Sequence, residues 1–242
     1  LELRFLFFAL AEHYNAWRWL GWVLVPCAFL MLMGLRRPLP WPVVAYPQEY
    51  RSYAAIPVAV GLLGWFWLVN LLSDGSAEPL PYVPLINPLE LGMLIVLFAV
   101  QRWAPDGLPA LAIRPRQMQL AAQAVVGASL FALLTMMVCR TAFHWGQVPF
   151  QADALVGSQL VQAGLSIVWT LIALSLTITG HLRARRDLWM TGAALIGVVV
   201  VKLFFVDLGN SGSLERIISF IGVGVLLLSL IHISEPTRRR GI

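Results

Sequence analysis

The residues best suited to chemistry in this chain gather around its single lysine. Lys202 lies in a long apolar run that ends at Asp207, and Glu215 and Arg216 follow a short polar turn. An ammonium group in hydrocarbon is costly, so Lys202 requires a partner or a hydrated cavity. Lys202 and Asp207 are separated by about 140° around a helix, so another helix or Glu215 must supply any carboxylate partner. The cluster either closes a helical bundle or serves transport or catalysis.

Glu90 is a further acidic residue whose place follows from its neighbours. Asn87, Pro88 and Glu90 have the pattern of a helix start, with Asn87 as N-cap, Pro88 in the first turn and Glu90 as the acid of a capping box. This pattern predicts a local structural role for Glu90 ahead of a proton-carrying one. Glu90 is expected at the same side of the membrane as the turn after Lys202.

A polar stripe is predicted on one face of a later apolar helix. It comprises Gln159, Gln162, Ser166 and Thr170, and Thr177 continues it. The spacings of three, four, four and seven residues keep these side chains on one face. Such a face either forms hydrogen bonds to neighbouring helices or lines a hydrated path.

Composition indicates the elements that position these residues. The chain of 242 residues is 59% hydrophobic and 12% charged, with ten tryptophans, whereas soluble domains are about 25% charged. The net charge of +5 comes from arginines spread between apolar runs, which argues for membrane topology and against nucleic-acid binding. We therefore predict an all-α fold, a polytopic transmembrane helical bundle of about seven spans with no soluble domain.

The apolar runs give the expected spans. They cover about 16–34, 53–72, 87–100, 119–139, 158–179 and 188–208, and a seventh begins near residue 213. Pro26 is expected to kink the first span. Ala124, Ala128 and Ala132 in the fourth span form a small-residue face suited to close helix contact. Cys27 and Cys139 fall in different spans, where inert packing is expected in place of a disulfide.

The arginines of the loops predict the orientation. One set of alternating loops holds Arg36, Arg37, Arg51, Arg102, Arg114, Arg116, Arg183, Arg185 and Arg186. The opposite loops hold Arg140 and Arg216. Because basic loops stay in the cytoplasm, we predict a multi-pass protein of the bacterial inner membrane. Its first residue is periplasmic and its last cytoplasmic.

The two ends of the sequence look foreign to a complete protein. Leu1 opens inside an apolar segment, and Leu228–Arg238 resembles a translated sequencing adapter. We expect residues 1–227 to be the transmembrane region of a longer protein and residues 228–242 to be a non-native tail. The expected partners are the lipid bilayer and upstream helices of the full-length chain.

Three stretches carry a family resemblance. They are Pro79–Gly92, Ser158–Leu174 and Asp187–Leu228, and the KLFFVDL and ERIISFIGVG segments of the last are the most specific. From about Trp41 to Leu228 the chain is similar to the C-terminal part of the domain of unknown function 2339 family, large predicted membrane proteins of bacteria. The resemblance implies many more helices upstream and no particular activity.

The sequence leaves the function and substrate open. It contains no P-loop, HExxH, GxSxG or CxxC motif, and isolated His13 and His144 do not predict a metal site. No cofactor is expected. The leading hypothesis is transport or envelope assembly. One alternative is a membrane-embedded enzyme that acts on an envelope lipid or glycan carrier, with Asp153, Asp207, Glu90 or His144 as acid and base. Another is a structural scaffold.

Overall fold

The computed structural model describes residues 15–35, 37, 39–108 and 115–204. These residues form helices joined by loops, and no β-strand occurs among them. The all-α fold class is therefore confirmed. The chain divides into two compact units, residues 1–155 and 156–242, and each is described by itself. Glu215, Arg216 and Asp207, with the whole of the expected seventh span and the expected tail, lie outside the described residues.

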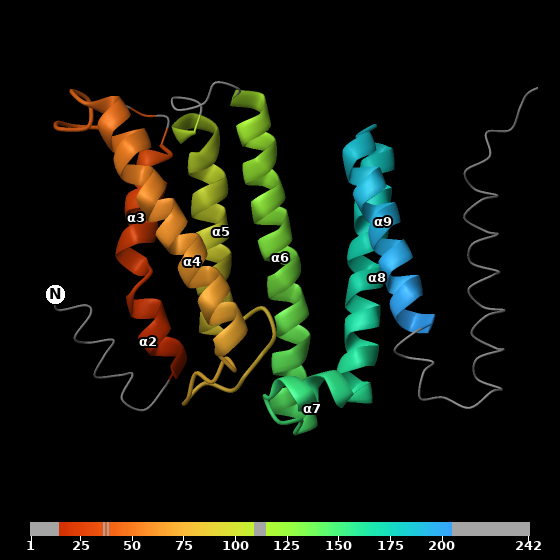
Figure 1. Cartoon of the computed structure of the whole chain (residues 1–242). Coiled ribbons are helices and arrows are strands. Elements are labelled where there is room, and N and C mark those ends of the chain that lie inside the picture. The colour runs from red at the N-terminus through yellow and green to blue at the C-terminus, as the bar shows by residue number, and fades with distance from the viewer. Residues whose placement is uncertain (1–14, 36, 38, 109–114, 205–242) are drawn as a thin grey trace, which may run out of the picture. The chain divides into compact units, whose positions relative to one another are not determined.

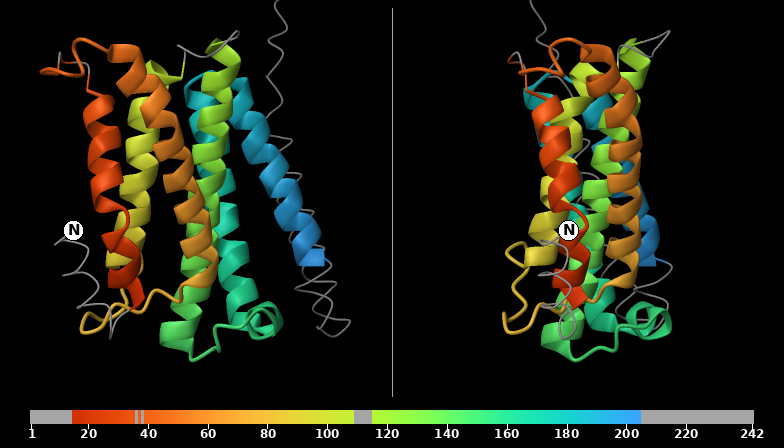
Figure 2. Two further views of the ribbon diagram at one scale, coloured as in Figure 1. Left: turned by 60° about the vertical axis from the view of Figure 1, so that its left-hand side comes forward. Right: turned by 90° about the vertical axis from the view of Figure 1, so that its left-hand side faces the viewer.

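The first unit is a bundle of antiparallel helices (Figures 1 and 2). Its elements are α2 (Asn15–Gly21), α3 (Leu24–Met33), the π-helical turn η1 (Glu49–Ala54), α4 (Ala55–Leu72), α5 (Pro88–Gly107) and α6 (Pro115–Gly146). The short helix α7 (Ala152–Gly157) follows α6. Of these, α5 contacts α2, α3, α4 and α6 and is the central helix. It buries residues along its length from Leu89 to Gly107 and leaves one stripe, Leu91, Ile95 and Phe98, exposed.

The first span is broken one turn before its proline. Helix α2 ends at Gly21 and α3 begins at Leu24, so the break falls at Trp22 and Val23. Pro26 has no N–H to donate to the carbonyl of Trp22, and its ring crowds that carbonyl. The predicted kink is thus confirmed, with its bend at the residues that precede Pro26.

Helix α6 differs from the prediction in both its length and its packing face. It continues to Gly146, so Arg140 and His144, which were expected in a loop, lie in its last two turns. Nothing in this segment breaks a helix before Gly146. Ala124 and Ala128 of the expected small-residue face are exposed and Ala132 is half-buried, whereas Leu133 is in the apolar core and Ala122 and Val126 pack against it. Within the first unit, α6 therefore packs mainly through a different face.

The second unit is described as a helical hairpin of α8 (Gln159–Leu182) and α9 (Arg186–Lys202). Small residues allow the backbones of α8 and α9 to approach closely. A Cβ at Gly192 would overlap the backbone nitrogen of Thr177, and one at Gly180 would overlap that of Trp189. The connecting turn returns the chain through Ala184, which has a φ of 49°.

Four segments of the described residues are long and apolar enough to cross a membrane. They are Ala16–Met33, Glu49–Leu72, Arg116–Gly146 and Gln159–Leu182. They support the predicted transmembrane bundle, and the total of seven spans stays a prediction. The central helix α5 has 20 residues but is not among the four.

Candidate functional site

The largest fully buried side chain among the described residues is that of Arg140 in α6, which is 0% exposed. Around it lie Asn70 and Ser73 at the end of α4, Tyr82 in the following loop, and Glu90 in the first turn of α5. We call these five residues the Arg140 cluster. Three helix ends and one loop therefore meet at one guanidinium group.

The guanidinium binds mainly to backbone oxygens that the end of α4 leaves unpaired. Its Nε donates to the carbonyl of Ser73 at 3.1 Å, and Nη2 donates to the carbonyl of Asn70 at 2.9 Å. The last carbonyls of any helix lack partners within that helix. Arg140 thus supplies a charged C-terminal cap to α4 from a neighbouring helix, which suits the helix dipole.

Glu90 supplies the opposite charge. Its Oε1 lies 3.7 Å from Nη1 of Arg140 and accepts a hydrogen bond of 2.7 Å from the hydroxyl of Tyr82. Its Oε2 accepts a hydrogen bond of 2.7 Å from the backbone N–H of Leu85. Because Glu90 is 1% exposed, this is a buried ion pair.

The predicted helix start at α5 is confirmed for its first two residues and differs for the third. Asn87 is the N-cap, accepting from the N–H of Leu89 at 2.9 Å, and Pro88 opens the helix. Glu90 does not complete a capping box with the N–H of Asn87, which donates to Val83 instead. The carboxylate reaches back to Leu85 because the loop folds over the end of the helix.

Tyr82 connects the cluster to the loop surface. Its ring stacks on that of His144, with centroids 4.5 Å apart, and its carbonyl accepts from the indole of Trp145. Burial, aided by the hydrogen bond to Glu90, raises the pKa of the Tyr82 phenol above its ordinary value. This contribution to stability is present below the ordinary phenol pKa and is lost as the pH rises through the raised one.

The loop after α4 is shaped to admit the arginine. Gly75 has a φ of 81°, and a Cβ there would lie 3.1 Å from Cδ of Arg140. Its carbonyl accepts a hydrogen bond of 2.8 Å from the side chain of Asn87, and His144 Nε2 donates to the carbonyl of Asp74 at 3.0 Å. Only glycine adopts this conformation without strain and leaves this space.

Two buried donors in the cluster have no hydrogen-bond partner among the described residues, Nη1 of Arg140 and Nδ2 of Asn70. Such groups are usually satisfied by buried water. The described residues include no group of three histidine, cysteine or acidic side chains that could hold a metal ion. Both cysteines, Cys27 and Cys139, are free and buried. The contacts within the Arg140 cluster are the ion pair with Glu90 and hydrogen bonds.

In the second unit, Lys202 meets the polar stripe. Its Nζ donates to the hydroxyl of Ser166 at 2.7 Å and to the carbonyl of Gln162 at 2.9 Å. Two features noted separately in the sequence thus lie together across α8 and α9. The hydroxyl of Thr170, also in the stripe, donates to the carbonyl of Ser166 within its own helix.

The other predicted site residues are less engaged. Gln159 and Thr170 are exposed on α8, and Asp153 is exposed on α7. Arg140, Asn70 and Tyr82 were not predicted from the sequence as parts of a site. One available signal was the absence of any helix breaker between Cys139 and Gly146, which places Arg140 in an apolar helix.

The apolar helices and the enclosed charges define the class of protein as a helical integral membrane protein. The family model described as "Predicted membrane protein (DUF2339)" matches residues 1–231. The chain belongs to this family. The match begins at the first residue and so extends further than the resemblance from Trp41. No curated protein and no solved structure is significantly similar to the chain.

Proposed function

We propose that this chain is a multi-spanning protein of the bacterial inner membrane that serves envelope assembly as a rigid helical module. In this proposal the Arg140 cluster holds the ends of α4, α5 and α6 together, and we call this role the structural lock. The observation that carries this role is the burial of both charges, because Arg140 is 0% and Glu90 1% exposed. This burial supports a structural role for the pair over direct contact with a transported solute.

A charge-free cluster tests this proposal. The double variant Glu90→Gln and Arg140→Met removes both charges and keeps one acceptor for Tyr82 or Leu85. In a deletion strain we expect its function per molecule to equal that of the unmodified chain, after correction for abundance in membrane extracts. Loss of function at normal abundance would instead assign the ion pair a role in transport or chemistry.

Transport is the second candidate, and it is favoured by Lys202. The ammonium lies among apolar helices and binds the polar stripe through Ser166 and Gln162. A transport role predicts that Lys202→Met abolishes function without loss of protein, whereas a structural role predicts lower abundance with normal function per molecule. If the Lys202→Met variant has normal function and normal abundance, Lys202 has neither role.

The third candidate is a membrane-embedded enzyme that uses Asp153 and His144 as acid and base. It requires that Asp153→Asn or His144→Gln abolish function while abundance is unchanged. Normal function in both variants would reject it.

A further inference from the structure

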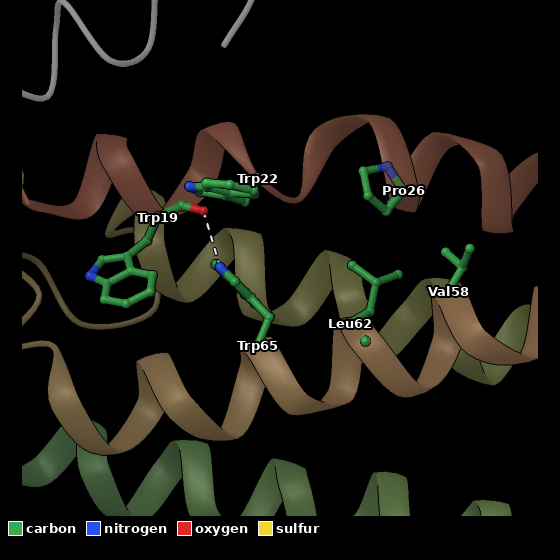
Figure 3. A pocket seen from close by; sticks show the side chains of 7 residues that line it. Trp19, Trp22, Pro26, Val58, Leu62 and Trp65 are labelled. Carbon is green, nitrogen blue, oxygen red and sulfur yellow. Dashed lines mark hydrogen bonds between the residues drawn. The ribbon is translucent and has the colours of Figure 1, made fainter.

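The first unit has a cavity in its side, between the broken first span and α4 (Figure 3). Its volume is about 410 Å³, within the range of small-molecule sites of ~300–1,000 Å³. Three indole rings, Trp19, Trp22 and Trp65, line one end, and Pro26 and Val58 line the other. We call this the tryptophan groove.

The break in the first span and one hydrogen bond shape the groove. The indole N–H of Trp65 donates to the carbonyl of Trp19 at 3.1 Å, which joins the two walls (Figure 3). The chain departs from helical geometry at Trp22 and Val23, where α2 and α3 are separated. Gly61, on the α4 wall, leaves open space, because a Cβ there would meet nothing within 4 Å.

The groove lies at the depth of the lipid tails. Gly61 is at the middle of the candidate span Glu49–Leu72, and Trp65 is four residues further, or about 6 Å along the helix. The hydrocarbon layer extends about 15 Å to each side of its middle. In a bilayer centred on this span, the groove therefore lies within the hydrocarbon layer, where acyl chains are the part of a lipid that can fill it.

Its length and lining suit an acyl chain. From Val58 to Trp65 the groove is about 10 Å long, at about 1.5 Å per helical residue. Its lining is mostly apolar. A single acyl chain is narrow enough to lie along it.

We propose that the tryptophan groove holds one acyl chain of a membrane phospholipid as a specifically bound lipid. The rigid indole rings provide extended packing surfaces that cost little conformational entropy, and van der Waals packing is the main attraction available within a bilayer. The bound phospholipid enters from the leaflet on the side of the Arg140 cluster, because Trp19 and Trp65 lie toward that end of their helices.

The test variant places a larger side chain inside the tryptophan groove. Gly61→Leu places an isobutyl group inside it, and Gly64→Leu is the matched control, since Gly64 lies on α4 outside the lining and also faces open space. Each chain is extracted by mild detergent from vesicles of phosphatidylethanolamine and phosphatidylglycerol. Native mass spectrometry then counts the phospholipids retained. We expect the unmodified chain and Gly64→Leu to keep one phospholipid that Gly61→Leu loses.

A second measurement tests whether an acyl chain lies in the tryptophan groove. In vesicles of phosphatidylcholine brominated in the half of one acyl chain nearer the bilayer middle, we expect Gly61→Leu to show less quenching of tryptophan fluorescence than Gly64→Leu. Circular dichroism verifies that both variants remain helical. Equal lipid retention and equal quenching in the two variants would overturn the proposal, as would cross-linking of Gly61→Cys to another protein segment in place of lipid.

Discussion

Loss of the Arg140 side chain should destabilise the packing of three helices. Arg140 caps the end of α4, neutralises Glu90 at the start of α5, and belongs to α6. Removing one partner of a buried pair leaves the other charge uncompensated, which is costlier than removing both.

We expect Arg140→Met to lower the free energy of unfolding by about 3–5 kcal/mol. The double variant with Glu90→Gln should be less destabilised than this single variant, because no carboxylate is then left alone. Thermal unfolding in detergent measures both. Arg185→Met is the control, because the ion pair of Arg185 with Asp187 is exposed and should contribute little. Equal losses from Arg140→Met and Arg185→Met would contradict the structural lock.

Gly75 should resist even the smallest substitution. A left-handed conformation costs a residue with a Cβ about 1–2 kcal/mol, and here that atom would also press on Arg140 and Tyr82. We therefore expect Gly75→Ala to destabilise the first unit. Gly127→Ala in α6 has open space around it and should be neutral or stabilising by up to about 1 kcal/mol. The same thermal unfolding assay compares the two.

The residues differ in how far the sequence predicts their roles. Asn87 and Pro88 were predicted because a helix start depends on adjacent positions. The partner of Glu90 was not, because Arg140 is fifty residues further along the chain and only the fold brings the two together. The sequence indicated that Lys202 needs a partner, but it did not identify Ser166 as that partner.

At the scale of elements, the hairpin of α8 and α9 depends on close backbone contact. In a bilayer, helices associate through packing of small residues more than through burial of apolar surface. Gly192 faces the backbone of α8 at Ala173 and Thr177, whereas Gly197 of the same helix faces open space.

We expect Gly192→Leu to separate the hairpin and lower its stability by roughly 1–3 kcal/mol, typical of overpacking. Gly197→Leu should leave stability unchanged. Protease resistance of the hairpin in detergent and its thermal unfolding provide the measurement. A hairpin that tolerates both substitutions equally would show that backbone contact at Gly192 is unimportant.

Apolar runs predict where helices lie but not where they end or which face packs. The fourth span was predicted to end at Cys139, directly before Arg140, and the helix continues because Arg140 has its partners inside the protein. The small-residue face of Ala124 and Ala128 was a sound pattern, but the packed face depends on the shapes of α4 and α5.

At the scale of the whole molecule, membrane insertion follows from composition, while orientation rests on the distribution of arginines. The loop at Arg183 is basic, and the loop between α4 and α5 contains Asp74 and Glu78 without a basic residue. We infer that the first faces the cytoplasm and the second the periplasm.

Cysteine labelling tests this orientation. Leu80→Cys and Arg183→Cys are both at exposed positions, and Cys27 and Cys139 are buried. On intact spheroplasts, a membrane-impermeant maleimide should modify Leu80→Cys and leave Arg183→Cys unmodified until the membrane is opened. The unsubstituted chain controls for background. The reverse pattern would invert the topology.

The position of α5 has a consequence for biogenesis. This helix occupies the centre of its unit, yet its composition does not by itself suit a membrane span. A segment with Glu90 and Arg102 near its ends gains little by entering lipid alone, and it becomes favourable once α6 brings Arg140 to Glu90. We therefore expect α5 to reach its final depth only after α6 has been synthesised and Arg140 can pair with Glu90.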